Sequence, residues 1–252
     1  MIVSVTSGVR GGVGKSVVSL LAAYLLNYLG EAALLVDAGG GCTKYLLDSP
    51  DPPYTRELPR TYDAIISYRV SIRREKGRFL RRKEVEEKSF DLYFTPEVRA
   101  LTPGEVEALV QVVPELDDYF SYVILDLPAI SGDHYWTLAE LGDTRLIVVT
   151  PEKAVYDMVL STERLGGNII PVLNKFDKEI ESHKEAQARL KEFFGDLIVV
   201  PYDPVLKVLS LRGVSILAYM NPEKETMSSF SELIYRLSSK LPRKEVRVRG
   251  RA

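Results

Sequence analysis

The segment between residues 2 and 30 constrains the fold more than any other part of the chain, because it joins two apolar runs through a glycine-rich turn. IVSVT, residues 2–6, is short and rich in β-branched residues, as expected of a buried strand. SVVSLLAAYLLNYLG, residues 16–30, has the length of a helix and ends on Gly30, a typical C-cap residue. The segment therefore predicts a strand, a tight turn and a helix, the unit from which doubly wound sheets are built.

The rest of the chain repeats the alternation of strands and helices. The prolines of 50–60 predict a loop, residues 61–70 a short helix, and 71–88 either a hairpin or an extended excursion. A helix is expected at 103–116, with an interruption near Pro114. The remaining apolar and amphipathic segments predict strands at 32–37, 90–96, 121–128, 144–151, 169–175 and 196–203, and helices at 183–195 and 223–240.

These elements predict an α/β fold with a doubly wound, mostly parallel sheet and helices on both faces. No linker is visible, so we expect a single domain over residues 1–241, with a basic excursion at about 69–88 and a basic, flexible tail at 242–252. In the last helix, the apolar residues at helical spacing suit either a membrane surface or, as we favour, packing on the sheet. They are Met227, Phe230, Leu233, Ile234 and Leu237.

The glycine-rich turn has the composition of a phosphate-binding loop. Gly11, Gly12 and Gly14 allow the backbone to curl so that successive N–H groups point at phosphate oxygens. The helix that follows adds its positive end. Lys15 would neutralise charge between the terminal phosphates, and the Ser16 hydroxyl would ligate Mg²⁺. The loop therefore predicts binding of ATP with Mg²⁺.

Arg10 points to one family of such loops. The stretch R-G-G-V-G-K-S resembles K-G-G-x-G-K-[ST], the deviant Walker A motif of the ParA/MinD-type partition and Min ATPases, a branch of the P-loop NTPases. The resemblance implies that Arg10 matches the family's first lysine, which reaches across an ATP-dependent homodimer to the partner's nucleotide, and that Val17 stands where many members carry a second hydroxyl. It makes nucleotide-binding residues of Arg10, Gly11, Gly12, Val13, Gly14, Lys15, Ser16 and Val17.

Two acidic residues follow predicted strands. YVILDLPAISG resembles the family's Walker B segment, which implies that Asp126 holds Mg²⁺ through water. ALLVDAGGGC resembles the segment that usually reads D-x-D, so Asp37 matches its first acid while Gly39 replaces the second, which activates the attacking water in the family. The resemblance thus implies Ser16, Asp126 and Asp37 as metal-site residues and Arg10, Lys15 and Asp37 as catalytic residues. The loss at position 39 puts hydrolysis in doubt more than binding.

Further matches lie downstream in the same order as in the family. Asn174 in PVLNK matches the asparagine that reads the adenine edge, and Pro201, Tyr202 and Asp203 match the closing V-P-x-D segment that flanks the base. Cys42 is interpreted as structural, because a single cysteine excludes an internal disulfide framework and a multi-cysteine metal site within one chain.

The charge distribution is uneven although the net charge is only −2. Residues 69–83 contain eight basic residues and one acid, and residues 242–252 contain five basic residues and one acid. These patches are compatible with plain surface charge, or with nonspecific binding of DNA or another anionic surface. No apolar run reaches the ~18 residues of a membrane span, and the start lacks a signal peptide's basic region. We expect a cytoplasmic protein.

Three functions fit these observations. We favour an ATP-driven dimerising switch of the partition or Min type, which organises DNA or another cargo and responds to an activator protein. A nucleotide-binding pseudo-ATPase or scaffold with little hydrolysis is the alternative that Gly39 suggests. A metabolic synthetase on the same fold is the third, but such enzymes usually lack the residue that Arg10 resembles.

Overall fold

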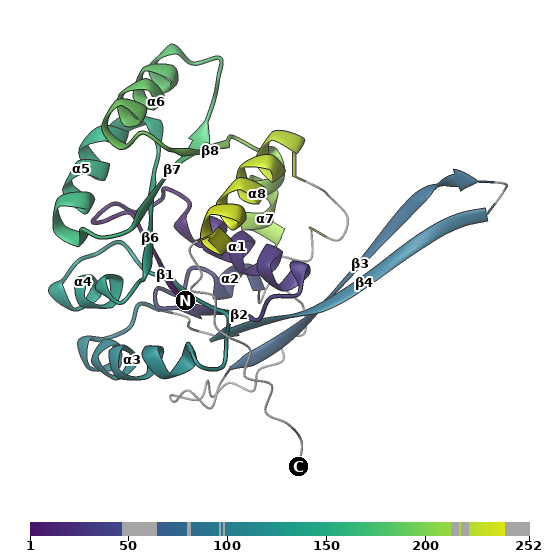
Figure 1. Cartoon of the computed structure of the whole chain (residues 1–252), viewed down its shortest axis with the longest axis horizontal. Coiled ribbons are helices and arrows are strands. Elements are labelled where there is room, and N and C mark those ends of the chain that lie inside the picture. Colours follow the sequence, from purple (N-terminus) through teal and green to yellow (C-terminus); the bar gives the residue numbers. More distant parts are fainter. Residues whose placement is uncertain are drawn as a thin grey trace.

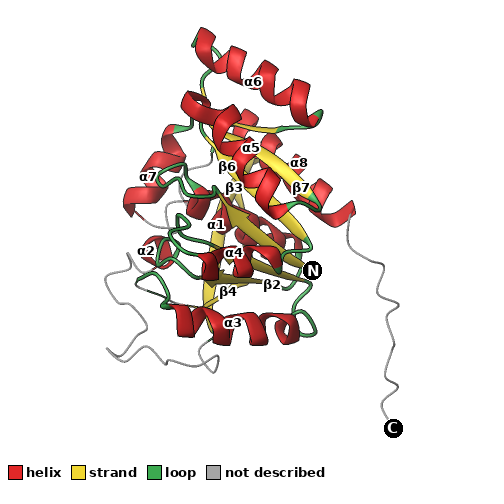
Figure 2. Ribbon diagram, turned by 90° about the vertical axis from the view of Figure 1, so that its left-hand side faces the viewer, coloured by secondary structure: helices red, strands yellow, loops and turns green. Residues whose placement is uncertain are grey.

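The computed structural model contains one eight-stranded sheet with helices on both faces, as expected (Figures 1 and 2). The strand order is β3-β4-β2-β5-β1-β6-β7-β8; all neighbours pair in parallel except β3 and β4, which are antiparallel. The structure describes residues 1–46, 65–79, 82–95, 97, 99–212, 217 and 222–239. The predicted loop at 50–60 and the tail at 242–252 lie outside this part of the chain.

The strands agree with the sequence prediction at the centre of the sheet and differ at its edge. In chain order they are β1 Ile2–Thr6, β2 Ala33–Asp37, β3 Ile66–Phe79, β4 Arg82–Thr95, β5 Tyr122–Asp126, β6 Thr144–Val149, β7 Ile169–Phe176 and β8 Ile198–Pro201. The expected short helix at 61–70 is wrong where the chain is described, because β3 begins at Ile66 and pairs with β4 instead. Of the two alternatives for 71–88, the hairpin is correct.

The helices were predicted less completely than the strands. They are α1 Lys15–Leu29, α2 Thr43–Leu46, α3 Pro103–Leu116, α4 Asp133–Glu140, α5 Ala154–Leu165, α6 Glu181–Phe194, α7 Pro204–Arg212 and α8 Lys224–Ser239, with a 3-10 turn, η2, at Pro151–Lys153. The expected interruption of α3 is wrong: Pro114 lies in the last turn, where the helix ends two residues later. The sequence did not predict α2, α4, α5 or α7.

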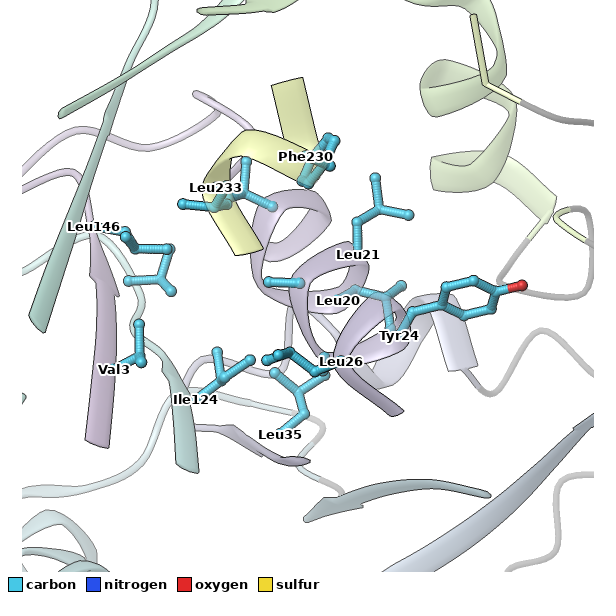
Figure 3. Close-up of a cluster of buried hydrophobic side chains, with 14 of the residues drawn as sticks. Val3, Leu20, Leu21, Tyr24, Leu26, Leu35, Ile124, Leu146, Phe230 and Leu233 are labelled. Carbon is cyan, nitrogen blue, oxygen red and sulfur yellow. The ribbon is translucent and has the colours of Figure 1, made fainter. Parts of the chain in front are cut away.

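Alternate residues of the central strands enter two separate cores. In β5, Tyr122 and Ile124 pack into the core beneath α1 and α8, while Val123 and Leu125 pack into the core beneath α3, α4, α5 and α6. Figure 3 shows the first core, where Ile124 lies near α1. Burial on both faces explains why the strands are continuously apolar in sequence.

The apolar row of α8 packs into the first core, as we favoured. Phe230, Leu233 and Leu237 are at most 1% exposed and Ile234 is 6% exposed, whereas Met227 is half-buried. This row is therefore occupied by the sheet and α1 rather than free for another surface (Figure 3). Among the described residues, no helix combines the length and the apolar character needed to cross a membrane.

Candidate nucleotide-binding site

The glycine loop lies between β1 and the start of α1, as the sequence predicted. Gly14 is the N-cap of α1 and adopts a left-handed backbone with φ 92°, which favours glycine. Within α1, no side chain caps the N-terminus and the first turn has no acid. The first N–H groups of α1 therefore keep their capacity to bind an anion, and the loop fits a phosphate group.

Lys15 is held at the base of the loop by its own chain. Its side chain is buried, and its Nζ donates to Ser7 Oγ at 2.8 Å and to the Arg10 carbonyl at 3.3 Å. Burial lowers the pKa of Lys15, and the charge of Asp126 opposes that change. The ammonium is thus positioned before any ligand arrives, which reduces the ordering cost of binding.

Asp126 ends β5 directly beneath the loop. It is 1% exposed, and its carboxylate accepts hydrogen bonds from Ser19 Oγ at 2.8 Å and Cys42 Sγ at 3.2 Å. Burial raises the pKa of Asp126, while hydrogen bonds from Ser16, Ser19 and Cys42 act in the opposite direction. Ser16 and Asp126 therefore lie together, as the predicted magnesium site requires.

Gly41 closes this cluster from the side of β2. A Cβ at this position would lie 2.2 Å from Ser16 Oγ and 3.3 Å from Asp126 Oδ2. A methyl group at this position would displace the Ser16 hydroxyl and would lie 3.1 Å from Ser16 Cβ, so glycine allows the segment after β2 to pack closely against the predicted metal-site residues.

Asp37 lies opposite Asp126 in the pairing of β2 with β5, but its carboxylate faces its own loop. It accepts hydrogen bonds from the N–H groups of Gly39, Gly41 and Thr43 at 3.2, 3.1 and 2.6 Å, and from the Thr43 hydroxyl at 2.7 Å. Burial, followed by the charge of Asp126, raises the pKa of Asp37 to about 7, against these hydrogen bonds. Asp37 shapes the loop; its metal and catalytic roles stay predictions.

The loop opens into a pocket of about 470 Å³ that unites most predicted binding residues. Its lining comprises Gly12, Gly14, Lys15, Ser16, Val17, Tyr45, Asn174, Lys175, Pro201, Tyr202, Asp203, Leu206 and Lys207. Four of the other predicted residues, Gly11, Val13, Asp37 and Asp126, do not line it. The pocket thus joins the phosphate loop to the segment expected around the base.

The predicted base-reading residues also support the backbone around the pocket. Asn174 Nδ2 donates to the Val13 carbonyl at 2.8 Å. Asp203 accepts from the N–H groups of Val205 and Glu223 at 2.8 and 2.7 Å. These polar groups are partly engaged within the chain, so their predicted contact with a base stays a prediction.

Arg10 does not line the pocket but forms an ion pair within its own chain. Its Nε lies 2.5 Å from Asp157 Oδ2, on α5. The Asp157 side chain is 6% exposed and that of Arg10 is 36% exposed. Arg10 is accordingly close to the surface, restrained by one buried carboxylate.

Several residues of the site carried no distinctive signal in the sequence. Four of them take part in the site only through a partner elsewhere in the chain: Ser19, Cys42, Thr43 and Asp157. Of these, Ser19 could have been predicted, because it lies one helical turn after Lys15 on the same face of the helix. Lys175 has φ 58°, unusual for a residue with a side chain, and its Nζ donates to the Gly12 carbonyl at 2.7 Å. The thiol of Cys42 is part of the Asp126 cluster, which the structural interpretation of this residue did not anticipate.

Comparisons with known proteins agree with this geometry. MinD from Pyrococcus furiosus has a TM-score of 0.67 at 23% identity, covering 94% of this chain and 98% of that structure. A putative plasmid partition protein from Borrelia burgdorferi, bound to AMPPNP, has a TM-score of 0.68 at 16% identity, covering 95% and 98%. Both likenesses concern the fold.

Sequence relatives point the same way. An uncharacterised ATP-binding protein of Methanocaldococcus jannaschii is 25% identical, covering 87% of this chain and 81% of the relative. The septum site-determining protein MinD of Bacillus subtilis is 28% identical, covering 85% and 74%. The family model described as the CobQ/CobB/MinD/ParA nucleotide binding domain matches residues 4–216. The phosphate loop, the sheet and these matches together establish that the chain belongs to the CobQ/CobB/MinD/ParA nucleotide-binding domain family.

Proposed function

We propose that the protein is an ATP-driven switch that dimerises with ATP and Mg²⁺ bound and separates after hydrolysis or release. One observation carries the proposal: Lys15 and Ser16 line an open pocket while Asp126 lies buried directly behind Ser16. A cation, a hydroxyl and a carboxylate so arranged suit a phosphate chain with a bound magnesium ion.

Each residue has a separate task in this proposal. Lys15 binds the terminal phosphates, and the uncapped start of α1 adds N–H donors. Ser16 and Asp126 hold the magnesium ion, whose charge offsets that of the phosphates. Asp37 holds the backbone of residues 39–43 in place through its hydrogen bonds. A water molecule or a phosphate that binds beside this loop therefore contacts a backbone that is already ordered.

In the dimer, Arg10 leaves Asp157 and contacts the nucleotide of the second subunit. The bidentate guanidinium suits phosphate oxygens, and its partial exposure makes it available for such a contact. Sedimentation with Mg²⁺-ATP tests both steps. Lys15→Ala should lose nucleotide and dimer together, whereas Arg10→Ala should retain nucleotide and lose the dimer. Normal dimerisation of Arg10→Ala would refute the role across the interface.

A second candidate is a nucleotide-binding scaffold that hydrolyses ATP negligibly. Gly39 favours it, since no carboxylate stands at that position and Asp37 is committed to four hydrogen bonds with its loop. ATPase rates of the wild type and Gly39→Asp separate the candidates: measurable turnover by the wild type, as fast as that of Gly39→Asp, argues against the scaffold. A Cβ at position 39 would lie 3.2 Å from the Pro128 backbone, so Gly39→Ala is the matched control for crowding.

The cargo in this proposal is DNA, bound without sequence preference, and an activator protein sets the rate of turnover in the cytoplasm. Support comes from the basic residues of 69–83 and 242–252 and from the similarity to a plasmid partition protein. Binding of a DNA duplex should fall as salt rises, because phosphate contacts release counterions. A salt-insensitive or absent interaction would remove the partition function and leave the nucleotide switch untouched.

A further inference from the structure

The hairpin formed by β3 and β4 extends far beyond the body of the protein (Figure 1). Its base is anchored: Phe90, Leu92 and Phe94 are buried, and the Phe90 ring meets Tyr24 of α1 edge-on at 5.0 Å. Lys88 then lies over the Tyr28 ring at 3.7 Å. From Lys88 to Arg82 the strand continues for six more residues, about 20 Å at the usual rise per residue. The hairpin is thus an arm on a fixed base.

The register of the hairpin changes the meaning of its charge. Four basic residues of β3 stand directly opposite acidic residues of β4, where cross-strand partners are about 5 Å apart. The pairs are Arg69 with Asp91, Arg73 with Glu87, Arg74 with Glu86, and Lys76 with Glu84. Two further rungs carry one charge each, Lys88 opposite Ile72 and Glu75 opposite Val85, and these two charges are of opposite sign. The stem as a whole is therefore balanced in charge, which the charge count over 69–83 did not reveal.

The end of the arm has no such compensation. Arg78 pairs with Lys83 and Phe79 with Arg82, and no acid occurs in the sequence from 76 to 83. Three cations and one aromatic residue therefore occupy the last two described rungs. This register leaves the end of the arm with a net positive charge, which favours an anionic partner.

We infer that the hairpin tip is the DNA-binding element of this protein, with Arg78, Arg82 and Lys83 contacting the phosphates of a duplex groove. The inference rests on the proposed DNA cargo and locates it. A two-stranded ribbon fits the DNA major groove, which is about 12 Å wide. The two arginines suit bidentate phosphate contacts. An anionic membrane surface is the less suitable partner, because one aromatic residue in these rungs gives little apolar area for anchoring.

The size of the effect follows from counterion release. Each phosphate contact contributes about 0.9 to the slope of log affinity against log salt. Loss of three contacts should flatten the slope by up to about 2.7, and weaken binding at about 0.1 M salt by up to roughly 500-fold.

The experiment compares two triple variants that change net charge equally. One carries Arg78→Gln, Arg82→Gln and Lys83→Gln. The matched control removes three exposed cations of α6 by Lys184→Gln, Arg189→Gln and Lys191→Gln. Binding of a mixed-sequence DNA duplex is measured by fluorescence anisotropy over a salt series with Mg²⁺-ATP. The tip variant should show the flattened slope, and the control should bind as the wild type does.

Sedimentation of the same samples separates this inference from the proposed function. If the tip variant dimerises with ATP and still binds DNA like the control, the tip inference is wrong and the switch stands. If the wild type dimerises but binds no DNA, both the DNA cargo and the tip inference fail. If the tip variant loses binding to phosphatidylserine vesicles while the wild type ignores DNA, the arm is a membrane contact instead.

Discussion

Replacing Asp157 by asparagine is expected to tighten the ATP-dependent dimer that we propose. In the structure Arg10 Nε lies 2.5 Å from Asp157 Oδ2, an ion pair inside one chain. In the proposed dimer Arg10 exchanges this partner for the nucleotide of the second subunit. Removal of the carboxylate's charge therefore lowers the cost of forming the dimer without touching the phosphate loop.

The magnitude follows from the exposure of the pair. Asp157 is almost fully buried, but the Arg10 side chain is 36% exposed, so solvent screens the attraction and its net value is about 1 kcal/mol. A two-fold symmetric dimer breaks two such pairs, which gives about 2 kcal/mol. At about 1.4 kcal/mol for each factor of ten, the dimer dissociation constant should fall roughly 30-fold.

The assay is sedimentation equilibrium with a non-hydrolysable ATP analogue and Mg²⁺. Asp133→Asn is the matched control, because it removes the exposed partner of Arg164 on the neighbouring helices. The double variant Arg10→Ala, Asp157→Asn should dimerise no better than Arg10→Ala alone. An unchanged or higher dimer dissociation constant for Asp157→Asn would show that the ion pair with Asp157 does not oppose dimerisation.

Three further outcomes follow from the described contacts. Gly41→Ala should lower the affinity for Mg²⁺-ATP by at least tenfold in calorimetry, because its Cβ would displace Ser16 Oγ, 2.2 Å away. Thr102→Ala should lower the free energy of unfolding by about 1 kcal/mol in urea, since Thr102 and Glu105 form the capping box of α3. The hydrogen bond from Arg99, with those of Thr102, lowers the Glu105 pKa to about 2. The contribution of ionised Glu105 to the free energy of unfolding is therefore complete above about pH 4.5, its ordinary pKa, and is lost as the pH falls towards 2. In Glu105→Gln the free energy of unfolding should no longer fall over this pH range for this reason.

The chain offers a matched control for Gly41→Ala and for Thr102→Ala. Gly104→Ala places a methyl group where nothing lies within 4 Å, so nucleotide affinity should be unchanged. Thr137→Ala in α4 removes a hydroxyl that is not a cap, and should cost clearly less stability than Thr102→Ala. Equal losses for Thr102→Ala and Thr137→Ala would contradict the capping argument, and normal Mg²⁺-ATP binding by Gly41→Ala would contradict the close packing of that glycine.

Local patterns predicted the centre of the fold well. Strand β1, the glycine loop and α1 are contiguous, and each follows from its own residues: β-branched content, glycines and helical length. Helix α7 escaped prediction because its apolar and polar residues are only weakly segregated to two faces. Helices α4 and α5 were missed although they are about as amphipathic as the predicted helices α3 and α6. The short helix expected at 61–70 was wrong because pairing with β4 outweighs local preference there.

By itself, the sequence determined a phosphate loop followed by a helix, an acid at the end of a central strand, and a doubly wound sheet. These are properties of neighbouring residues. Tertiary structure alone decided which groups meet: Arg10 with Asp157, Ser19 with Asp126, and Asp37 with the loop it anchors. It also decided that the basic arm is compensated along its stem and positive at its tip, because cross-strand register depends on the fold of both strands together.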